Sequence, residues 1–333
     1  MLFILTHLKC LSKQFNKILF IIMKALHSWL LTEGAHGMIS QVEGLANGLN
    51  STFEHKFIKL SYFSRFLPPI FTPRVPSLFN FEELMSGVNS CPDYIISCGR
   101  KSVIPNLVIK KYLKEKFNKK VKNIHIQDPK ISASNFDYII VPEHDNKVSG
   151  DNIIYSKGAL HYLSEKEVLN TNKGDLILSL ILGGPNKYYS FSYDELKNIF
   201  FYLRNNQDLK KINIVASRRT PQEIFKKLQL EFSEPKFYFD ISLKKTNYTK
   251  ALSEASHLMI TCDSTSMISE AATTNKPVYV IKLNSVKNDY RFQRFFDLFK
   301  DLGIIRFFDG RIENWTYEKL YESRRVAKVI LEN

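Results

Sequence analysis

The segment that decides the fold runs from residue 257 to 272 and reads His-Leu-Met-Ile-Thr-Cys-Asp-Ser-Thr-Ser-Met-Ile-Ser-Glu-Ala-Ala. It predicts a short buried strand that leads directly into a helix. Asp263 and Ser264 follow the apolar run and are residue types that cap helix N-termini. A helix start presents unpaired backbone N–H groups and a partial positive charge, which together suit a phosphate. The alternative interpretation is a capped helix in an ordinary α/β domain.

Five residues of this segment are candidates for binding a nucleotide: Asp263, Ser264, Ser266, Met267 and Glu270. The two serines can donate hydrogen bonds to a phosphate. Glu270 lies four residues after Ser266, and residues at this spacing share a helix face. Its carboxylate can then reach a ribose hydroxyl while the phosphates lie on the backbone amides.

The remainder of the chain alternates short apolar runs with helical stretches, which is typical of parallel α/β proteins. Strands are expected at residues 26–31, 55–60, 94–98, 122–127, 138–141, 175–182, 212–216, 236–239, 257–260 and 277–281. We predict two Rossmann-like domains whose parallel sheets face a central cleft. The expected parts are an acceptor-side domain at 23–163, a nucleotide-binding domain at 164–316 and a closing helix at 317–333.

The amino-acid composition limits the classes of protein and partner that are expected. The chain has 333 residues, 44% of them hydrophobic and 24% charged, as in soluble globular proteins. Its formal net charge of +14 favours an anionic partner. The basic residues are scattered rather than gathered in one stripe, so no nucleic acid is expected. The spacings of Cys10, Cys91, Cys98 and Cys262 match neither a zinc site nor a CxxC motif, which predicts reduced thiols in a cytoplasmic protein.

Residues 1–22 form an N-terminal extension with three interpretations. Its apolar stretches are interrupted by Lys9, Lys13 and Lys17 and do not reach the roughly 18 residues that a membrane span requires. The extension is a weak amphipathic anchor, an additional helix or the result of a mis-assigned start, with Met23 as the alternative first residue.

Two polar turns that follow strands provide further candidates for phosphate binding. Gly183-Gly184-Pro185-Asn186 follows one strand, and glycines there let the backbone approach a ligand closely. Ser217-Arg218-Arg219-Thr220-Pro221 follows the next, and its guanidinium groups suit bidentate contact with a phosphate. Each turn also has a purely structural interpretation, as a tight turn or a solvated one. The candidates from these turns are Gly183, Gly184, Asn186, Ser217, Arg218 and Arg219.

Polar residues at the strand ends of the first domain are expected to face the same cleft. His36 stands in a glycine-flanked loop from which a general base can act, and Asp128 is a second candidate base. The candidates for substrate binding are Thr32, Gly34, Gln41, Arg100, Glu143, His144 and Asp145. The alternative for His36 is a loop histidine without a function. The spacing of Glu143, His144 and Asp145 fits no metal-binding loop, so no metal is predicted.

Many of these motifs, in this order, resemble those of the "elongated mitochondria" fission family and its bacterial relatives. The resemblance rests on Trp29–Gly34, Ile126–Pro129, Val141–Asp145, Ser217–Pro221 and Asp263–Ala271, among others. It implies a fold similar to GT-B glycosyltransferases, with the nucleotide held by the second domain. The bacterial relatives are labelled nucleoside-diphosphate-sugar epimerases or glycosyltransferases, and the eukaryotic ones are linked to mitochondrial fission. In the family loop Asp-Gly-x-x-Gly-His, this chain has Glu33 and Met38 at the Asp and His positions.

The expected function is that of a glycosyltransferase that uses a nucleotide-diphosphate sugar as its donor, with no tightly bound cofactor. The alternatives are a nucleotide-sugar epimerase of the same fold and a non-catalytic, membrane-associated scaffold. The stretch Tyr62–Arg74 is rich in aromatic residues and contains two arginines. It is interpreted either as a plain surface loop or as a peripheral contact with an anionic membrane carrying a lipid-linked acceptor.

Overall fold

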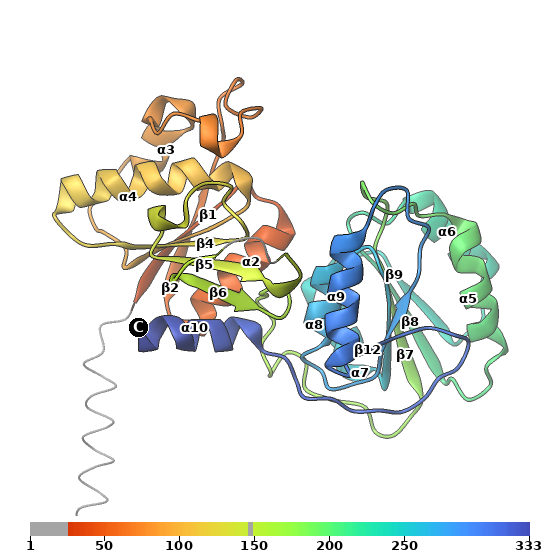
Figure 1. The fold of residues 1–333 in the computed structure, drawn as a ribbon. Helices are drawn as coiled ribbons and strands as arrows, with labels where there is room; N and C mark the ends of the chain where they lie inside the picture. The colour runs from red at the N-terminus through yellow and green to blue at the C-terminus, as the bar shows by residue number, and fades with distance from the viewer. Residues whose placement is uncertain (1–25, 146–148) are drawn as a thin grey trace, which may run out of the picture.

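The computed structural model describes residues 26–145 and 149–333. Within them the chain forms two parallel β-sheets of six strands each, with helices on both faces (Figure 1). The predicted N-terminal extension, residues 1–22, lies outside the described residues. In the part of the chain that is described, no helix has the length and apolar character needed to cross a bilayer.

The first sheet has the strand order β2-β1-β3-β4-β5-β6, and every pairing in it is parallel. Its strands are β1 (His27–Thr32), β2 (Thr52–Phe57), β3 (Tyr94–Cys98), β4 (Lys122–Ile126), β5 (Tyr138–Pro142) and β6 (Ile153–Ser156). One face packs on α3 (Phe81–Met85) and α4 (Val103–Phe117), and the other on α2 (His36–Gly48). Because both faces are covered, β3 is buried along its whole length.

The second sheet has the order β12-β11-β10-β7-β8-β9, again all parallel. Its strands are β7 (Ile177–Leu182), β8 (Lys211–Ala216), β9 (Phe237–Asp240), β10 (His257–Thr261), β11 (Val278–Ile281) and β12 (Ile305–Phe307). Its helices are α5 (Tyr193–Asn205), α6 (Gln222–Glu231), α7 (Lys245–Glu254), α8 (Thr265–Ala271) and α9 (Tyr290–Asp301). The segment predicted to join a strand to a helix forms β10 and α8, with Ser264 as the N-cap.

The last helix, α10 (Glu322–Glu332), returns to the first sheet and packs against α2 (Figure 1). Two glycines of α2 allow this close approach, since a Cβ on Gly48 would lie 2.6 Å from the Ser323 carbonyl oxygen. The closing helix begins at residue 322 and not at 317 as predicted. The preceding stretch is instead fixed to the end of α8, where Leu320 N–H donates to the Ala272 carbonyl at 3.1 Å.

The predicted α/β fold with two parallel-sheet units is confirmed. The first sheet ends with β6 and the second begins with β7, and the predicted boundary at residue 164 falls between them. Two edge strands, β6 and β12, were not predicted. They have only four and three residues, and the exposed Arg306 interrupts the apolar character of β12.

Candidate functional site between the two domains

The ends of β7, β8 and β10 are tied together by one buried carboxylate, that of Asp263. Its Oδ2 accepts hydrogen bonds from Gly184 N–H at 3.1 Å and from the Arg219 guanidinium at 2.6 Å. Asn186 donates from its side chain to the Asp263 carbonyl at 3.1 Å. A buried charge is tolerated only when it is paired and hydrogen-bonded, so these contacts fix the three turns relative to one another.

Gly183 and Gly184 are required by close packing. A Cβ at Gly183 would lie 2.1 Å from Asp263 Oδ1, and one at Gly184 would lie 2.0 Å from the Arg219 carbonyl oxygen. Both glycine amides already donate within the protein, so the predicted close approach of a ligand to this turn would not use them as donors. Gly183 N–H donates to Thr261 Oγ1 at 2.7 Å, and Gly184 N–H donates to Asp263.

In the neighbouring turn after β8, the two arginines have different contacts. Arg219 donates to Asp263 and also to the Gly184 carbonyl, so its guanidinium helps to hold the ends of β7, β8 and β10 together. Ser217 is held by its own turn, where its N–H donates to Thr220 Oγ1 at 2.8 Å. Arg218 is exposed and forms no ion pair or hydrogen bond with the described residues. Of the two guanidinium groups, that of Arg218 is the one available to a ligand.

Helix α8 carries a buried acid, Glu270. Its Oε2 accepts a hydrogen bond from the Tyr248 hydroxyl of α7 at 2.7 Å. Burial raises the pKa of Glu270 to about 7, although the bond from Tyr248 acts in the opposite direction. At the start of the same helix, Ser264 Oγ accepts from Met267 N–H at 3.4 Å, and Ser266 is half-buried beside it. A buried carboxyl that titrates near neutral pH is typical of a functional site.

His36 of the first domain faces charges of the second. Partial burial lowers the pKa of His36, and the positive charges of Arg218 and Lys245 lower it further, while Glu43 raises it. Its ring meets that of Tyr162 edge-on, with 5.9 Å between the ring centroids. Lys245 Nζ lies 4.1 Å from the centroid of the Tyr162 ring. The imidazole therefore stands at the junction of the two domains.

We refer to His36, Tyr162, Arg218, Lys245 and Glu270 as the interdomain cluster. Burial raises the pKa of Tyr162 to about 12, and the negative charge of Glu270 contributes, which places the phenol near that carboxylate. Sequence reasoning missed Tyr162 and Lys245. Neither belongs to a recognisable motif, and only the folded chain brings them to His36.

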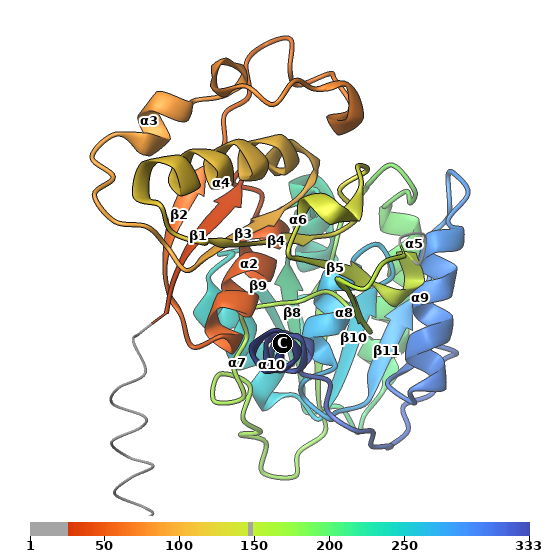
Figure 2. The ribbon, with the colours of Figure 1, turned by 60° about the vertical axis from the view of Figure 1, so that its left-hand side comes forward.

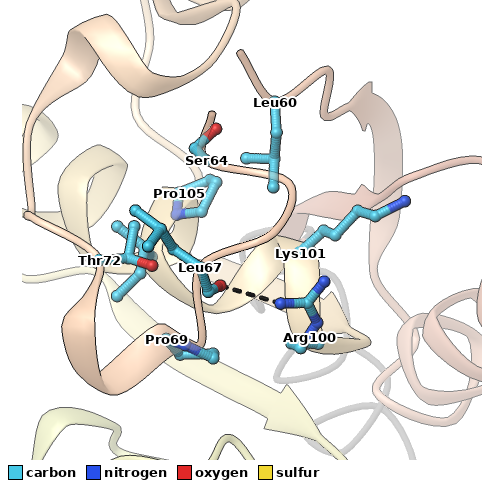
Figure 3. A pocket seen from close by; sticks show the side chains of 9 residues that line it. Leu60, Ser64, Leu67, Pro69, Thr72, Arg100, Lys101 and Pro105 are labelled. Carbon is cyan, nitrogen blue, oxygen red and sulfur yellow. Dashed lines mark hydrogen bonds between the residues drawn. The ribbon is translucent and has the colours of Figure 1, made fainter. Parts of the chain in front are cut away.

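Four other candidates of the first domain are occupied by local contacts. Thr32 is buried and its hydroxyl accepts from Gly34 N–H at 3.2 Å. The Gln41 side chain donates to the Gly37 carbonyl at 3.0 Å. Arg100 donates to the carbonyls of a neighbouring loop (Figure 3), and Asp128 forms an ion pair with Lys130. None of these side chains contacts the interdomain cluster through a hydrogen bond or ion pair among the described residues.

The 3₁₀ turn η5 (Glu143–Asp145) joins the two domains. It packs on α9, where the Arg294 guanidinium donates to the His144 carbonyl at 2.8 Å and Arg291 pairs with Asp145. The His144 ring packs against that of Phe295 with 5.2 Å between centroids. His144 and Asp145 thus make contacts between the two domains, and contact of Glu143, His144 or Asp145 with a substrate stays a prediction. Within the described residues, no group of three or more His, Cys, Asp or Glu side chains is arranged to hold a metal ion.

Two Rossmann-like units joined in this way, with a last helix that returns to the first unit, form a GT-B-like fold. The solved structure of a Listeria monocytogenes protein, assigned by inference as a UDP-N-acetylglucosamine 2-epimerase, superimposes with a TM-score of 0.53. The match has 13% sequence identity and covers 93% of this chain and 89% of the other, which shows a shared fold.

The family model for mitochondrial fission ELM1 matches residues 36–333, and the chain belongs to that family. It is 27% identical to an uncharacterized protein of Rickettsia prowazekii, over 92% of this chain and 98% of the relative. It is 24% identical to the mitochondrial fission protein ELM1 of Arabidopsis thaliana, over 71% of this chain. The chain spans 62% of the length of the plant protein.

Proposed function

We propose that the protein is a GT-B-type glycosyltransferase that binds a nucleotide-diphosphate sugar at the interdomain cluster. The observation that carries this proposal is the buried carboxyl of Glu270, whose pKa is raised to about 7, beside cationic groups at the domain junction. In open parallel sheets, ligands bind beyond the carboxyl ends of the strands. The fold shared with the Listeria protein, assigned as a UDP-N-acetylglucosamine 2-epimerase, supports the same ligand class.

The cationic side chains suit the diphosphate. The exposed Arg218 guanidinium can bind phosphate oxygens in a bidentate manner. Lys245, which is ion-paired with Glu167, adds a second positive charge near His36. The start of α8, with Ser264 and Ser266, supplies further donors. Glu270 then bonds a ribose hydroxyl, exchanging its present bond with Tyr248 for one to the ligand.

His36 is the proposed general base. Because its pKa is lowered, the imidazole is neutral at pH 7 and can accept the proton of an acceptor hydroxyl. Asp128, the second candidate, is held by Lys130 and would have to leave that ion pair first. The catalytic contribution of the protein then comes from placing acceptor and donor together and from stabilising the leaving diphosphate.

Thermal denaturation in millimolar UDP, GDP, ADP and CDP tests the binding step. Ligand present at 100 times its Kd stabilises the native state by about 2.7 kcal/mol, which raises Tm measurably. Arg218→Ala should weaken binding by roughly tenfold or more, the loss of one charge-assisted contact. Arg311→Ala, an exposed arginine distant in sequence from the cluster, is the matched control. A Tm that no nucleoside diphosphate changes would refute the proposal.

Two alternatives have their own support. The fold shared with the Listeria protein favours an epimerase, which would convert a sugar nucleotide in the absence of any acceptor, so product analysis separates the two activities. Membership of the fission family favours a non-catalytic, membrane-associated scaffold. Variants His36→Ala and Glu270→Ala should abolish the cellular role of an enzyme and leave that of a scaffold intact.

A further inference from the structure

Residues 57–78 form an exposed apolar surface on the first domain, which we call the aromatic loop. The side chains of Phe63, Phe66 and Phe71 are 79%, 73% and 72% exposed. Tyr62 and Ile70 are also well exposed beside them. In Figures 1 and 2 this orange segment extends past α4, on the outer side of the first domain. Large apolar side chains gathered on a surface indicate contact with another molecule or a membrane.

The aromatic loop is held in a defined shape. The Arg100 guanidinium donates to the Leu67 carbonyl at 2.9 Å and to the Arg65 carbonyl at 2.7 Å, as Figure 3 shows for the first of these bonds. Ser64 Oγ donates to the Leu78 carbonyl at 2.9 Å. The cavity under the loop has about 10 Å³, which is room for one water molecule. It therefore accepts no ligand, and the phenylalanines are presented outward from a fixed base.

The charge of the aromatic loop is entirely positive. Residues 57–78 contain no Asp or Glu, in a chain whose net charge is +14. Arg65 and Arg74 are exposed and form no ion pair within the described residues, whereas Lys59 is paired with Glu83. Aromatic side chains combined with unpaired cations are the composition that binds the interface of an anionic membrane.

We propose that the aromatic loop docks the first domain on an anionic lipid bilayer. Phe63, Phe66 and Phe71 would enter the interfacial region, and Arg65 and Arg74 would contact lipid phosphates. Docking of this kind requires neither a nucleotide nor turnover, so it stands apart from the proposed transferase activity.

The aromatic loop is connected to the turn before α2, and His36 is the first residue of that helix and not a loop residue as predicted. Lys101, next to Arg100, forms an ion pair with Glu33, and a Cβ on Gly34 would contact the Phe57 ring at 3.8 Å. These contacts tie the base of the aromatic loop to the turn that leads into α2. If the proposed function is correct, docking on a bilayer favours an acceptor carried by a lipid.

Sedimentation of the full chain with vesicles tests the docking. Vesicles of phosphatidylcholine with phosphatidylglycerol are compared with vesicles of phosphatidylcholine alone. The triple variant Phe63→Ser, Phe66→Ser, Phe71→Ser should partition at least about tenfold more weakly into the anionic vesicles. Arg65→Gln and Arg74→Gln should each weaken binding about fivefold at low salt. The matched control replaces two comparably exposed side chains of the second domain, Leu230→Ser and Tyr290→Ser.

Each outcome of the vesicle sedimentation experiment either supports or overturns the docking proposal. The proposal holds if the control sediments like the wild type and the triple variant does not. It is overturned if the wild type fails to sediment with anionic vesicles, or if the triple variant sediments equally well. It is also overturned if only the oligomeric state of the triple variant changes, since the loop would then be a protein contact. Nucleotide-dependent stabilisation, measured on the same proteins, reports on the proposed function separately.

Discussion

At the scale of single residues, the packing of the ends of β7, β8 and β10 depends on the absence of a side chain at Gly184. A Cβ there would lie 2.0 Å from the backbone carbonyl oxygen of Arg219, and a backbone atom cannot move aside cheaply. Gly184→Ala should therefore lower the free energy of unfolding by about 2–4 kcal/mol in urea titrations. Gly37→Ala is the control, because a Cβ at this helical position meets nothing within 4 Å and should be neutral or slightly stabilising.

The raised pKa of Glu270 leads to a second prediction at this scale, on how stability depends on pH. Its pKa is about 7 in the folded protein against 4.5 ordinarily, so between these values the native state binds the extra proton. Stability that depends on this carboxyl is thus lost as pH rises from about 4.5 to 7. Glu270→Gln carries no such penalty, and its stability relative to the wild type should increase across that window by up to about 3 kcal/mol. A difference that stays constant from pH 5 to 8 would contradict the assignment.

At the scale of elements, apolar runs predicted the central strands because those strands are buried on both faces. The pattern located β3 and β10 to within one residue, and capping residues predicted the start of α8 at Ser264. Short edge strands such as β12 carry too few apolar residues to be distinguished from loops. The start of α10 was missed for a different reason, since tertiary hydrogen bonds hold the preceding residues in a non-helical course.

The docking of α10 on α2 yields a prediction for that element. Ile330 is 1% exposed and belongs to the same apolar cluster as Val42 and Leu45 of α2, whereas its neighbour Leu331 is 48% exposed. Ile330→Ala should cost about 2–4 kcal/mol, since it removes buried methyl groups and leaves a cavity. Leu331→Ala, one residue away in the same helix, should change stability by less than about 0.5 kcal/mol. Equal costs in urea unfolding would show that α10 is not packed as described.

At the scale of the whole molecule, the candidate site arises from the way the two domains meet. Motifs at strand ends placed His36 and Arg218 on facing sides, but only the assembled chain adds Tyr162, from the stretch that links the domains, and Lys245. The sequence could not show which polar side chains form hydrogen bonds or ion pairs with other parts of the protein and are therefore not free to bind a ligand. Arg219 and Arg100 satisfy carbonyl or carboxylate groups of the protein, and that depends on contacts between segments far apart in the chain.

Three of the four buried histidines among the described residues give the final prediction, which concerns the stability of the entire molecule in acid. Burial lowers the pKa of His125 to about 3 and that of His144 and His161 to about 4. The unfolded chain protonates these rings near pH 6.5, so their contribution to stability is present above that pH and is lost as the pH falls. Below pH 6, unfolding takes up about three protons at these residues and releases about one from Glu270.

The net uptake of about two protons at these four residues should contribute a fall of roughly 2–3 kcal/mol in the free energy of unfolding between pH 6 and pH 5, and His257, whose pKa burial also lowers, acts in the same direction. Urea titrations at half-unit pH intervals measure this slope directly. His144→Gln removes one of the three rings, and it should reduce the slope by about one proton because the neutral amide does not titrate. A free energy of unfolding that remains level, or rises, from pH 6 to 5 would mean that the three rings are accessible to protons in the native state.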